Sequence, residues 1–577
     1  MTPNAFAPAT LGGLALRNRV IKTATYEGMS PGGVPSDALV EHHRELAAGG
    51  VGLTTVAYCA VSPDGRTFAE QMVMNRETVT PLARVTDAVH REGGAASLQL
   101  GHCGWFTKNT ELSTWLPRGP SLVVNQYGIS VGKPVGLAMN EREIAALIED
   151  FGRAAGLARK AGFDAVELHL GHGYLLSQFL CPATNRRRDA WGGDLAGRAR
   201  LALAVLRRVR EEVGAGLPVL CKTNLRDGFR GGLELDESVA LARLLEAEGA
   251  DALVLSGGFT SRTPFYLFRG RRPLAEMIDA EKSRLQKLAL RWFGRKVIRE
   301  YPFEEMFFLP QAREVRRAVR MPLVLLGGIV SRSNVDAALA EGFDFVAMGR
   351  ALIADPDLVK RMATDASARS RCTHCNVCVA EMDLGGVRCV LDGPRPQPSQ
   401  GPEVDAYVSL GSNLGDREAH LAAAIEALRA RPGMRVTSVS KVYETAPVGP
   451  PPQGPYLNAA LRLRTRLAPR ALLACLLEIE AAEGRQRSDS RWSARTLDLD
   501  LLFYGSLTLD EPGLRVPHPH LHERAFVLEP LRDLAPQLVH PLLGKTVEEL
   551  ARKVRDPGAV VAFQLGPRAR TFEKANE

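Results

Sequence analysis

Two aspartates, Asp498 and Asp500, alternate with leucines in the segment RTLDLDLLF. Side chains on a β-strand alternate between its two faces, so both carboxylates point the same way, about 7 Å apart along the backbone. Carboxylates that face the same space repel each other and shift their pKa values unless a cation lies between them. One interpretation is a strand face paired with the arginines just upstream. The better one is magnesium, which binds through one or two carboxylates together with substrate phosphates, and a pair of ions about 4 Å apart would suit an in-line displacement.

Loops near these aspartates are suited to a ligand that contains phosphate and a flat ring. SLGSNLGDR, residues 409–417, and YETAPVGPPPQGPYLNAAL, residues 443–461, are rich in glycine and proline. Tyr456 and Phe526 can stack on a ring, and the amide of Asn458 offers both a donor and an acceptor. These residues predict phosphoryl chemistry on an aromatic, nitrogen-rich ring.

These motifs, with RWSARTLDLDLL and VPHPHLHERAFVLEPL, resemble 6-hydroxymethyl-7,8-dihydropterin pyrophosphokinase along residues 405–553. The resemblance implies transfer of the terminal diphosphate of ATP to the hydroxymethyl oxygen of the pterin, a step of folate synthesis. It implies that Asp498 and Asp500 bind Mg²⁺, and that Arg485 and Arg495 clamp the transferring phosphates. The resemblance also places Arg491 and Trp492 in a mobile loop over ATP, Glu480 at an acidic position before that loop, and His518 and Arg524 at further nucleotide contacts. The pterin pocket that it implies is formed by Thr445, Pro447, Tyr456, Asn458 and Phe526.

A second group of polar side chains lies in HLGHGYLLSQFLCPATNRRRDAWGGD, residues 169–194. His169, His172 and Tyr174 stand where a strand becomes a loop, so three hydrogen-bonding groups can converge on one ligand oxygen. A zinc pair or two satisfied core histidines would explain an isolated HxxH equally well.

The elements around this group alternate between short apolar strands and longer helical patterns. Eight such strands between residues 20 and 350 indicate a (β/α)₈ TIM barrel better than an open sheet. The chemistry of such barrels gathers where strands run into their following loops. Unusual residues fall at these strand ends: Tyr26, Cys59, Gln99, His169 and His172, Lys222, Gly257 and Gly258, Gly327 and Gly328, and Gly349 with Arg350.

With the segment 169–194, residues 1 to about 390 resemble the old yellow enzyme family of FMN-dependent oxidoreductases. The resemblance implies that His169 and His172 hold the substrate oxygen, that Tyr174 donates a proton, and that NAD(P)H is the reductant. Gln99 then matches the residue that hydrogen-bonds the flavin ring. Two strand-to-helix turns, which contain Gly327 with Gly328 and Gly349 with Arg350, are expected to hold the flavin phosphate.

Two positions depart from the pattern of that family. Lys222 stands where an arginine usually faces the flavin, which keeps the positive charge but loses the guanidinium fork. Tyr26 stands where threonine or cysteine is common, which puts the redox tuning of the flavin in doubt. Residues 259–310 form a long insertion, which we interpret as a helical lid or packing segment in preference to a nucleic-acid patch.

Four cysteines cluster near residue 380, in the pattern Cys372-x2-Cys375-x2-Cys378-x10-Cys389. This spacing suits a [4Fe-4S] cluster, and it resembles the trimethylamine dehydrogenase and dienoyl-CoA reductase branch of the barrel family. A zinc knot or a vestigial site are alternatives. The five other cysteines are scattered, as expected for reduced thiols in a cytoplasmic protein.

The whole chain is expected to contain two domains, since 577 residues exceed one core. The segment 392–403, rich in proline and glycine, predicts a linker between a barrel at 1–391 and an α+β (ferredoxin-like) domain at 404–577. The net charge of +8 is dispersed, so we expect small-molecule substrates and neither a nucleic-acid nor a membrane partner. A homo-oligomer that forms through the barrel is a further expectation. The alternative is a pterin pyrophosphokinase whose barrel only binds flavin or serves assembly.

Overall fold

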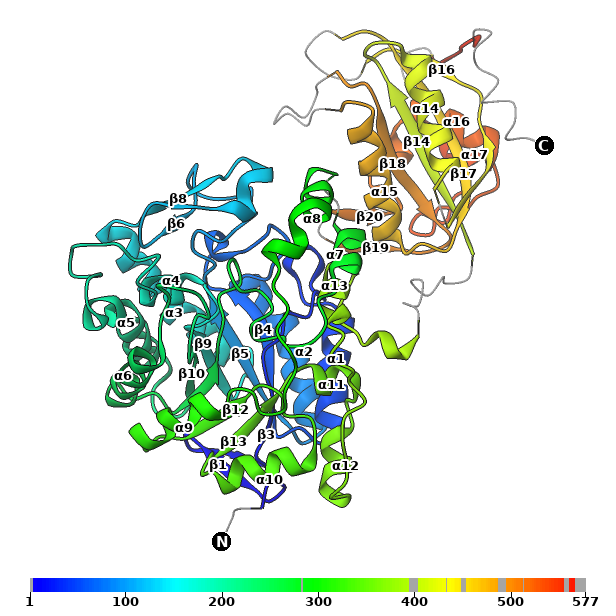
Figure 1. Ribbon diagram of the computed structural model, residues 1–577. Helices are drawn as coiled ribbons and strands as arrows, with labels where there is room; N and C mark the ends of the chain where they lie inside the picture. Colours follow the sequence, from blue (N-terminus) through cyan, green and yellow to red (C-terminus); the bar gives the residue numbers. More distant parts are fainter. Residues whose placement is uncertain are drawn as a thin grey trace. The chain divides into compact units, whose positions relative to one another are not determined.

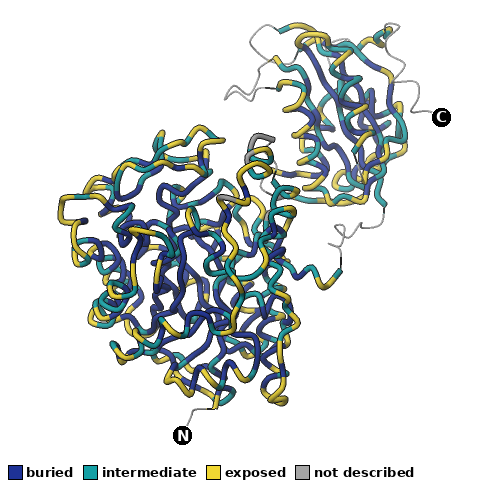
Figure 2. Tube along the Cα trace, in the orientation of Figure 1, coloured by how far each residue is buried: buried dark blue, intermediate teal, exposed yellow. Residues whose placement is uncertain are grey.

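The computed structural model describes residues 4–281, 284–393, 403–431, 433–447, 453–485, 494–511, 513–554 and 560–565. The chain separates into two compact units, Met1–Pro394 and Arg395–Glu577 (Figure 1). Each unit has its own buried interior, which Figure 2 shows in dark blue. Most of the expected linker lies outside the described residues.

The first unit is built on a closed barrel of eight strands, each parallel to its neighbours. The predicted (β/α)₈ barrel is therefore confirmed. In chain order its strands are β3 (Val20–Lys22), β4 (Leu53–Ala60), β5 (Ala95–Gly101), β9 (Ala165–His169), β10 (Val219–Asn224), β11 (Ala252–Ser256), β12 (Leu323–Leu326) and β13 (Phe345–Met348).

Helices surround the barrel, and their apolar faces explain why the strands are buried throughout. The outward side chains of the strands and the inward faces of the helices form one large core, as expected for a parallel sheet covered by helices. These helices include α1 (Asp37–Ala48), α2 (Arg76–Arg91), α3 (Glu141–Lys160), α5 (Leu195–Val213), α6 (Leu235–Ala247), α9 (Leu309–Ala318) and α10 (Arg332–Ala340).

A hairpin of β1 (Ala9–Leu11) and β2 (Leu14–Leu16) closes one end of the barrel. Leu11 and Leu16 are buried in a second core with residues at the strand beginnings, among them Leu53 and Ala95. Apolar side chains therefore fill this end, and we expect the site at the opposite end, where the strands finish.

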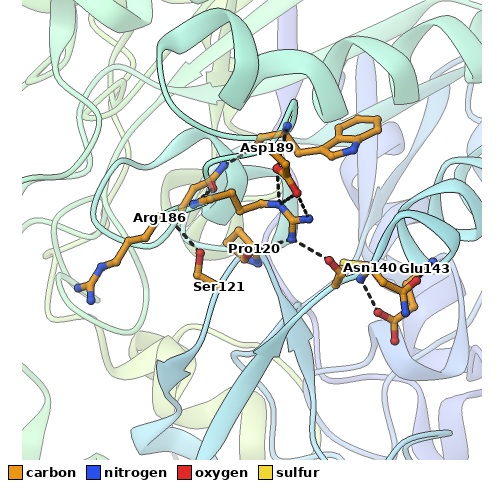
Figure 3. Close-up of polar contacts among 10 residues, drawn as sticks. Pro120, Ser121, Asn140, Glu143, Arg186 and Asp189 are labelled. Carbon is orange, nitrogen blue, oxygen red and sulfur yellow. Dashed lines mark hydrogen bonds and ion pairs between the residues drawn. The ribbon is translucent and has the colours of Figure 1, made fainter.

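Two excursions rise from that opposite end. The first is a small sheet of β6 (Arg118–Gly119), β7 (Val123–Val124) and β8 (Val135–Ala138). The loop after β9 holds this sheet, because Arg187 donates to the carbonyl oxygens of Pro120, at 3.1 Å, and Met139, at 2.7 Å. Asp189 accepts from Arg187 Nε at 2.9 Å. Figure 3 labels Pro120 and Asp189 on the two sides of this contact. The second excursion, after β11, contains α7 (Leu274–Ala280) and α8 (Arg284–Val297).

The second unit is an α+β domain around an antiparallel sheet. The sheet order is β18-β14-β17-β16-β21, and a further strand, β15 (Met434–Val439), pairs with β17. The other strands are β14 (Val404–Ser412), β16 (Tyr443–Thr445), β17 (Tyr456–Thr465), β18 (Asp498–Tyr504) and β21 (Val561–Ala562). One face packs on α14 (Arg417–Arg429) and α15 (Pro469–Ala482), and the other packs on α16 (Ala525–Leu534) and α17 (Val547–Lys553).

Within the described parts of both units, no helix is long and apolar enough to cross a bilayer.

Candidate active sites

The first unit contains a cavity of about 670 Å³ at the carboxyl ends of its strands. Its size is within the range of pockets that hold cofactors and substrates. Predicted site residues from six of the eight strands or their following loops line it: Tyr26, Gln99, His169, His172, Tyr174, Lys222, Gly327, Gly328, Gly349 and Arg350.

His169, His172 and Tyr174 lie together on one side of this cavity. The ring of His169 is 5.0 Å from that of His172 and 4.7 Å from that of Tyr174. His172 Nε2 is 2.8 Å from Ser256 Oγ, whereas His169 Nδ1 is buried without a hydrogen-bond partner among the described residues. An unpaired buried nitrogen is costly, so His169 is well placed to bind a ligand atom.

Burial determines the protonation states of these three side chains. It lowers the pKa of His172 to about 3, and Lys222 lowers it further. Burial also lowers the pKa of His169 well below its usual range, and His172 and Lys222 lower it further. Burial raises the pKa of Tyr174 to about 12. At neutral pH the site therefore offers two uncharged imidazoles and a phenol that still carries its proton.

Gln99 and Lys222 are joined below the cavity by a residue that sequence reasoning missed, Glu167. One carboxylate oxygen, Oε1, accepts from Gln99 Nε2 and from Lys222 Nζ, both at 2.7 Å. Glu167 is 2% exposed and does not line the cavity. Its sequence signal was present, because Glu167 stands two residues before His169 on one strand and so faces the same way.

Gly327, Gly328 and Arg350 stand at the end of the cavity where β12 and β13 finish. Gly327 and Gly328 have φ values of 99° and 74°, which side chains with a Cβ rarely adopt. Arg350 Nη1 donates to the carbonyl oxygen of Arg269 at 2.9 Å and to Asn376 Oδ1. The predicted phosphate-binding arginine is thus tied to the insertion and to the cysteine segment.

The insertion contributes part of the cavity wall. Gln286, Leu290 and Phe293 of α8 line the cavity, and Gln286 accepts from Lys108 Nζ at 3.0 Å and donates to Ser130 Oγ at 2.6 Å. These contacts connect α8 to the excursion after β5, so this segment lies where a lid would.

The four clustered cysteines line one small cavity of about 20 Å³, next to Arg350. Among the described residues, one group of at least three His, Cys, Asp or Glu side chains has all its ligand atoms within 4.8 Å of one another, and it consists of Glu27, His42 and His43. The four cysteines do not form such a group. The cysteines are therefore spread more widely than one tetrahedral zinc ion needs, since bonds of about 2.3 Å place its sulfurs only about 3.8 Å apart.

In the second unit, Asp498 and Asp500 lie on the face of β18 opposite the buried Leu499 and Leu501, as the alternation predicts. Asp498 accepts from Arg485 at 2.6 Å and from Arg495 at 2.9 Å. Burial and the neighbouring Asp498 raise the pKa of Asp500 to about 6. Glu480, on α15, is buried and accepts from Arg485 and from the amide of Leu499.

Register brings Asn458, which we predicted to contact the ring, next to these carboxylates. Gly411 of β14 pairs with Asn458 on one side and with Asp498 on the other. A Cβ at Gly411 would lie 3.4 Å from Asn458 Oδ1 and 3.8 Å from the Cβ of Asp498, so the glycine keeps this row open for a ligand. Asn458 Nδ2 donates to Thr445 Oγ1 at 2.8 Å, which fixes the orientation of the amide.

Of the remaining predicted residues of this site, Tyr456, His518, Arg524, Phe526 and Pro447 are described by the structure. Burial raises the pKa of Tyr456, which lies near Arg495 and Asp498. Arg524 stands 5.7 Å from the ring of Phe526. Burial, with Arg524 beside it, lowers the pKa of His518 to about 4. Pro447 follows β16 as a half-buried residue, and Arg491 and Trp492 lie outside the described residues.

Comparison with known proteins gives a match for each unit. Residues 4–258 match the NADH:flavin oxidoreductase / NADH oxidase family, and residues 407–536 match 7,8-dihydro-6-hydroxymethylpterin-pyrophosphokinase. A 4,4'-dithiodibutanoate disulfide reductase of Rhodococcus erythropolis is 45% identical over 391 residues, which are 68% of this chain and 95% of that protein. An NADH oxidase of Thermoanaerobacter brockii is 30% identical over 438 residues, 73% of this chain and 62% of its own length.

Solved structures resemble the first unit in fold. A complex of 2-naphthoyl-CoA reductase with 2-naphthoyl-CoA has a TM-score of 0.56 at 22% identity and covers 75% of this chain and 64% of that one. An old yellow enzyme homologue from Zymomonas mobilis has a TM-score of 0.50 at 24% identity, with coverage of 64% and 95%.

Proposed function

The chain belongs to the NADH:flavin oxidoreductase / NADH oxidase family through its first unit and carries a pterin pyrophosphokinase domain in its second. From this premise we propose which residues perform the two reactions. It is a bifunctional enzyme, an FMN-dependent oxidoreductase fused to a 2-amino-4-hydroxy-6-hydroxymethyldihydropteridine diphosphokinase that uses ATP and Mg²⁺. We propose boundaries near residues 391 and 404, and the cytoplasm as its location, because ATP and reduced nicotinamides are found there.

In the first unit, FMN would be held by Gln99 and Lys222 at its ring and by the turns at Gly327, Gly328, Gly349 and Arg350 at its phosphate. The residues fit such a group, since His169 Nδ1, Thr23 Oγ1 and Thr25 Oγ1 are buried without partners among the described residues and all three residues line the cavity. When bound, FMN would supply hydride-transfer chemistry between NAD(P)H and the substrate.

Convergence of His169, His172 and Tyr174 on one side of the cavity is the observation that supports a reductase best. The two neutral imidazoles hold an electronegative atom of the substrate, and the phenol of Tyr174 donates the proton that the reduced product needs. The phenol is suited to this role because its raised pKa keeps it protonated.

The substrate class we propose is an organic disulfide, on the strength of the Rhodococcus erythropolis relative. The reaction balances as one disulfide, one NAD(P)H and one proton giving two thiols and NAD(P)⁺, with the S–S bond broken. Consumption of NADPH and NADH is measured with 4,4'-dithiodibutanoate and, in parallel, with an enone and a quinone. Turnover of the enone or quinone alone would replace the disulfide by an activated alkene or quinone.

In the second unit, Asp498 and Asp500 hold Mg²⁺, which neutralises phosphate charge when bound. Arg485 and Arg495 clamp the transferring diphosphate, with Arg491, Trp492, His518 and Arg524 at the nucleotide. Thr445, Pro447, Tyr456, Asn458 and Phe526 form the pterin pocket. Incubation with ATP, Mg²⁺ and hydroxymethyldihydropterin is expected to release AMP, and its absence in folded protein would refute the assignment.

The four cysteines, Cys372, Cys375, Cys378 and Cys389, hold a [4Fe-4S] cluster, supported by their shared cavity and by a spread too wide for one zinc ion. Iron and sulfide analysis tests this, together with absorbance near 400 nm after the flavin is removed. Protein with zinc or without iron would contradict it. Association of copies through the barrel stays a prediction, which sedimentation would test.

A further inference from the structure

A buried carboxylate, Glu167, links the two residues that face the flavin ring in the proposed function. In the parallel pairing of β5 and β9, Glu167 lies directly opposite Gln99, and β10 places Lys222 opposite His169, two residues further along. From its position opposite His169, the side chain of Lys222 extends back to the carboxylate of Glu167. Gln99 and Lys222 are 4% and 1% exposed and line the cavity, whereas Glu167 lies behind them.

We propose that Glu167 is a positioning residue that sets the reduction potential of the flavin, by fixing Gln99 as a hydrogen-bond acceptor and by keeping Lys222 positively charged. This inference rests on the proposed function, because it requires FMN to bind in the cavity.

Hydrogen-bond chemistry fixes the amide of Gln99. An ionised carboxylate only accepts hydrogen bonds, so the group that faces Glu167 at 2.7 Å has to be the NH₂ of the amide. The amide oxygen is thereby directed away from Glu167. On the cavity side Gln99 therefore accepts a hydrogen bond from an N–H of the ligand, as a ring imide would supply.

Electrostatics fixes the state of Lys222. An ammonium group removed from water tends to lose its proton unless an anion lies beside it. The partner here is Glu167 at 2.7 Å: burial lowers the pKa of Lys222 and the carboxylate raises it again. A cation held beside a flavin favours the anionic reduced form over the neutral oxidised form.

The other charged groups around this pair form a second buried pair. Lys22 Nζ lies 3.0 Å from Glu27 Oε1, and both side chains are as deeply buried as the first pair. His43 lies 3.5 Å from Glu27, and His169 and His172 are neutral at ordinary pH. Lys22 and Glu27 do not line the cavity, and both affect the pKa of Lys222 less than Glu167 does. Glu27→Gln therefore serves as the control for loss of a buried counter-ion away from the cavity.

The test is the midpoint potential of the FMN-loaded full chain and of its Glu167→Gln variant. Loss of the counter-ion is expected to deprotonate Lys222. At a fixed potential the ratio of reduced to oxidised flavin should then fall about tenfold, which corresponds to a midpoint potential about 30 mV lower for two electrons. Lowering the pH is expected to restore the potential as Lys222 regains its proton, and Glu167→Asp is expected to restore most of it. Glu27→Gln is expected to change the ratio less than threefold.

The outcomes separate this inference from the proposed function. Wild-type protein that binds no FMN would refute the function itself. Wild-type protein that binds FMN, with an unchanged or raised potential in Glu167→Gln, would overturn the role of Glu167 alone. If Glu167→Gln does not fold, Lys222→Met tests the same charge, and an unchanged potential there would equally overturn the inference.

Discussion

At the scale of single residues, Asp498 and Asp500 carry the strongest expectation for the kinase half. Replacing either by Asn keeps its shape but removes a ligand charge, which is expected to slow diphosphate transfer about 1,000-fold, equivalent to about 4 kcal/mol of transition-state stabilisation. AMP release measures this loss. Flavin reduction by NAD(P)H in the same preparation is the control, and a variant that transfers diphosphate at the wild-type rate would remove the metal assignment.

The neutral histidines of the barrel give a prediction about pH. Because burial lowers the pKa of His172 to about 3 and that of His169 well below its usual range, reoxidation of reduced flavin by substrate is expected to be independent of pH between 5 and 8. Stopped-flow measurement would show a flat profile. A step in the rate near pH 6.5 would mean that one imidazole titrates at its ordinary pKa.

The same shifts affect stability, with a definite sign. Below pH about 6.5 the unfolded chain binds protons at these histidines, whereas in the folded chain their lowered pKa values keep them unprotonated. The free energy of unfolding therefore falls as the pH drops from about 6.5 towards the pKa values of the folded state. Each histidine contributes up to about 1.4 kcal/mol per pH unit. Urea unfolding of flavin-free protein at pH 7 and pH 5 is expected to show this loss, and His172→Asn is expected to reduce its slope.

At the scale of elements, Arg187 fixes the small sheet of β6, β7 and β8 to the loop after β9. Charge-assisted hydrogen bonds contribute about 1.5–3 kcal/mol each, so Arg187→Ala is expected to destabilise the first unit by about 2–4 kcal/mol in urea unfolding. Arg187→Lys would not restore the fork. Arg186→Ala, an exposed neighbour, is the matched control and is expected to change stability by less than about 0.5 kcal/mol.

Strand ends were the part of the site that sequence could predict. A strand fixes which side its residues face, so His169, Lys222, Asp498 and Asp500 followed from alternation and from the barrel rule. Contacts between strands could not be predicted in this way, because they depend on register. Register is what places Glu167 opposite Gln99, and Gly411 between Asn458 and Asp498.

The helical insertion shows the same limit for a whole element. Its helical segments could be predicted from LQKLALRWFGRK, but its place over the cavity depends on single contacts such as Gln286 with Lys108 and Ser130. Nothing in the periodicity of α8 specifies those partners. The place of this segment over the cavity therefore follows from tertiary contacts that a single sequence does not encode locally.

At the scale of the whole molecule, two sites on two hydrophobic cores should respond to ligands separately. Each core is built from residues of its own unit, and a ligand stabilises only the unit that binds it, by about 2.7 kcal/mol at 100 times its Kd. Calorimetry of the full chain is thus expected to show two transitions, one raised by FMN and the other by Mg²⁺ with a non-hydrolysable ATP analogue. Asp498→Asn, which weakens Mg²⁺ binding, should abolish the second shift and leave the first. A single transition that either ligand raises would instead mean that the two units unfold as one, and the catalytic halves would then be coupled through stability.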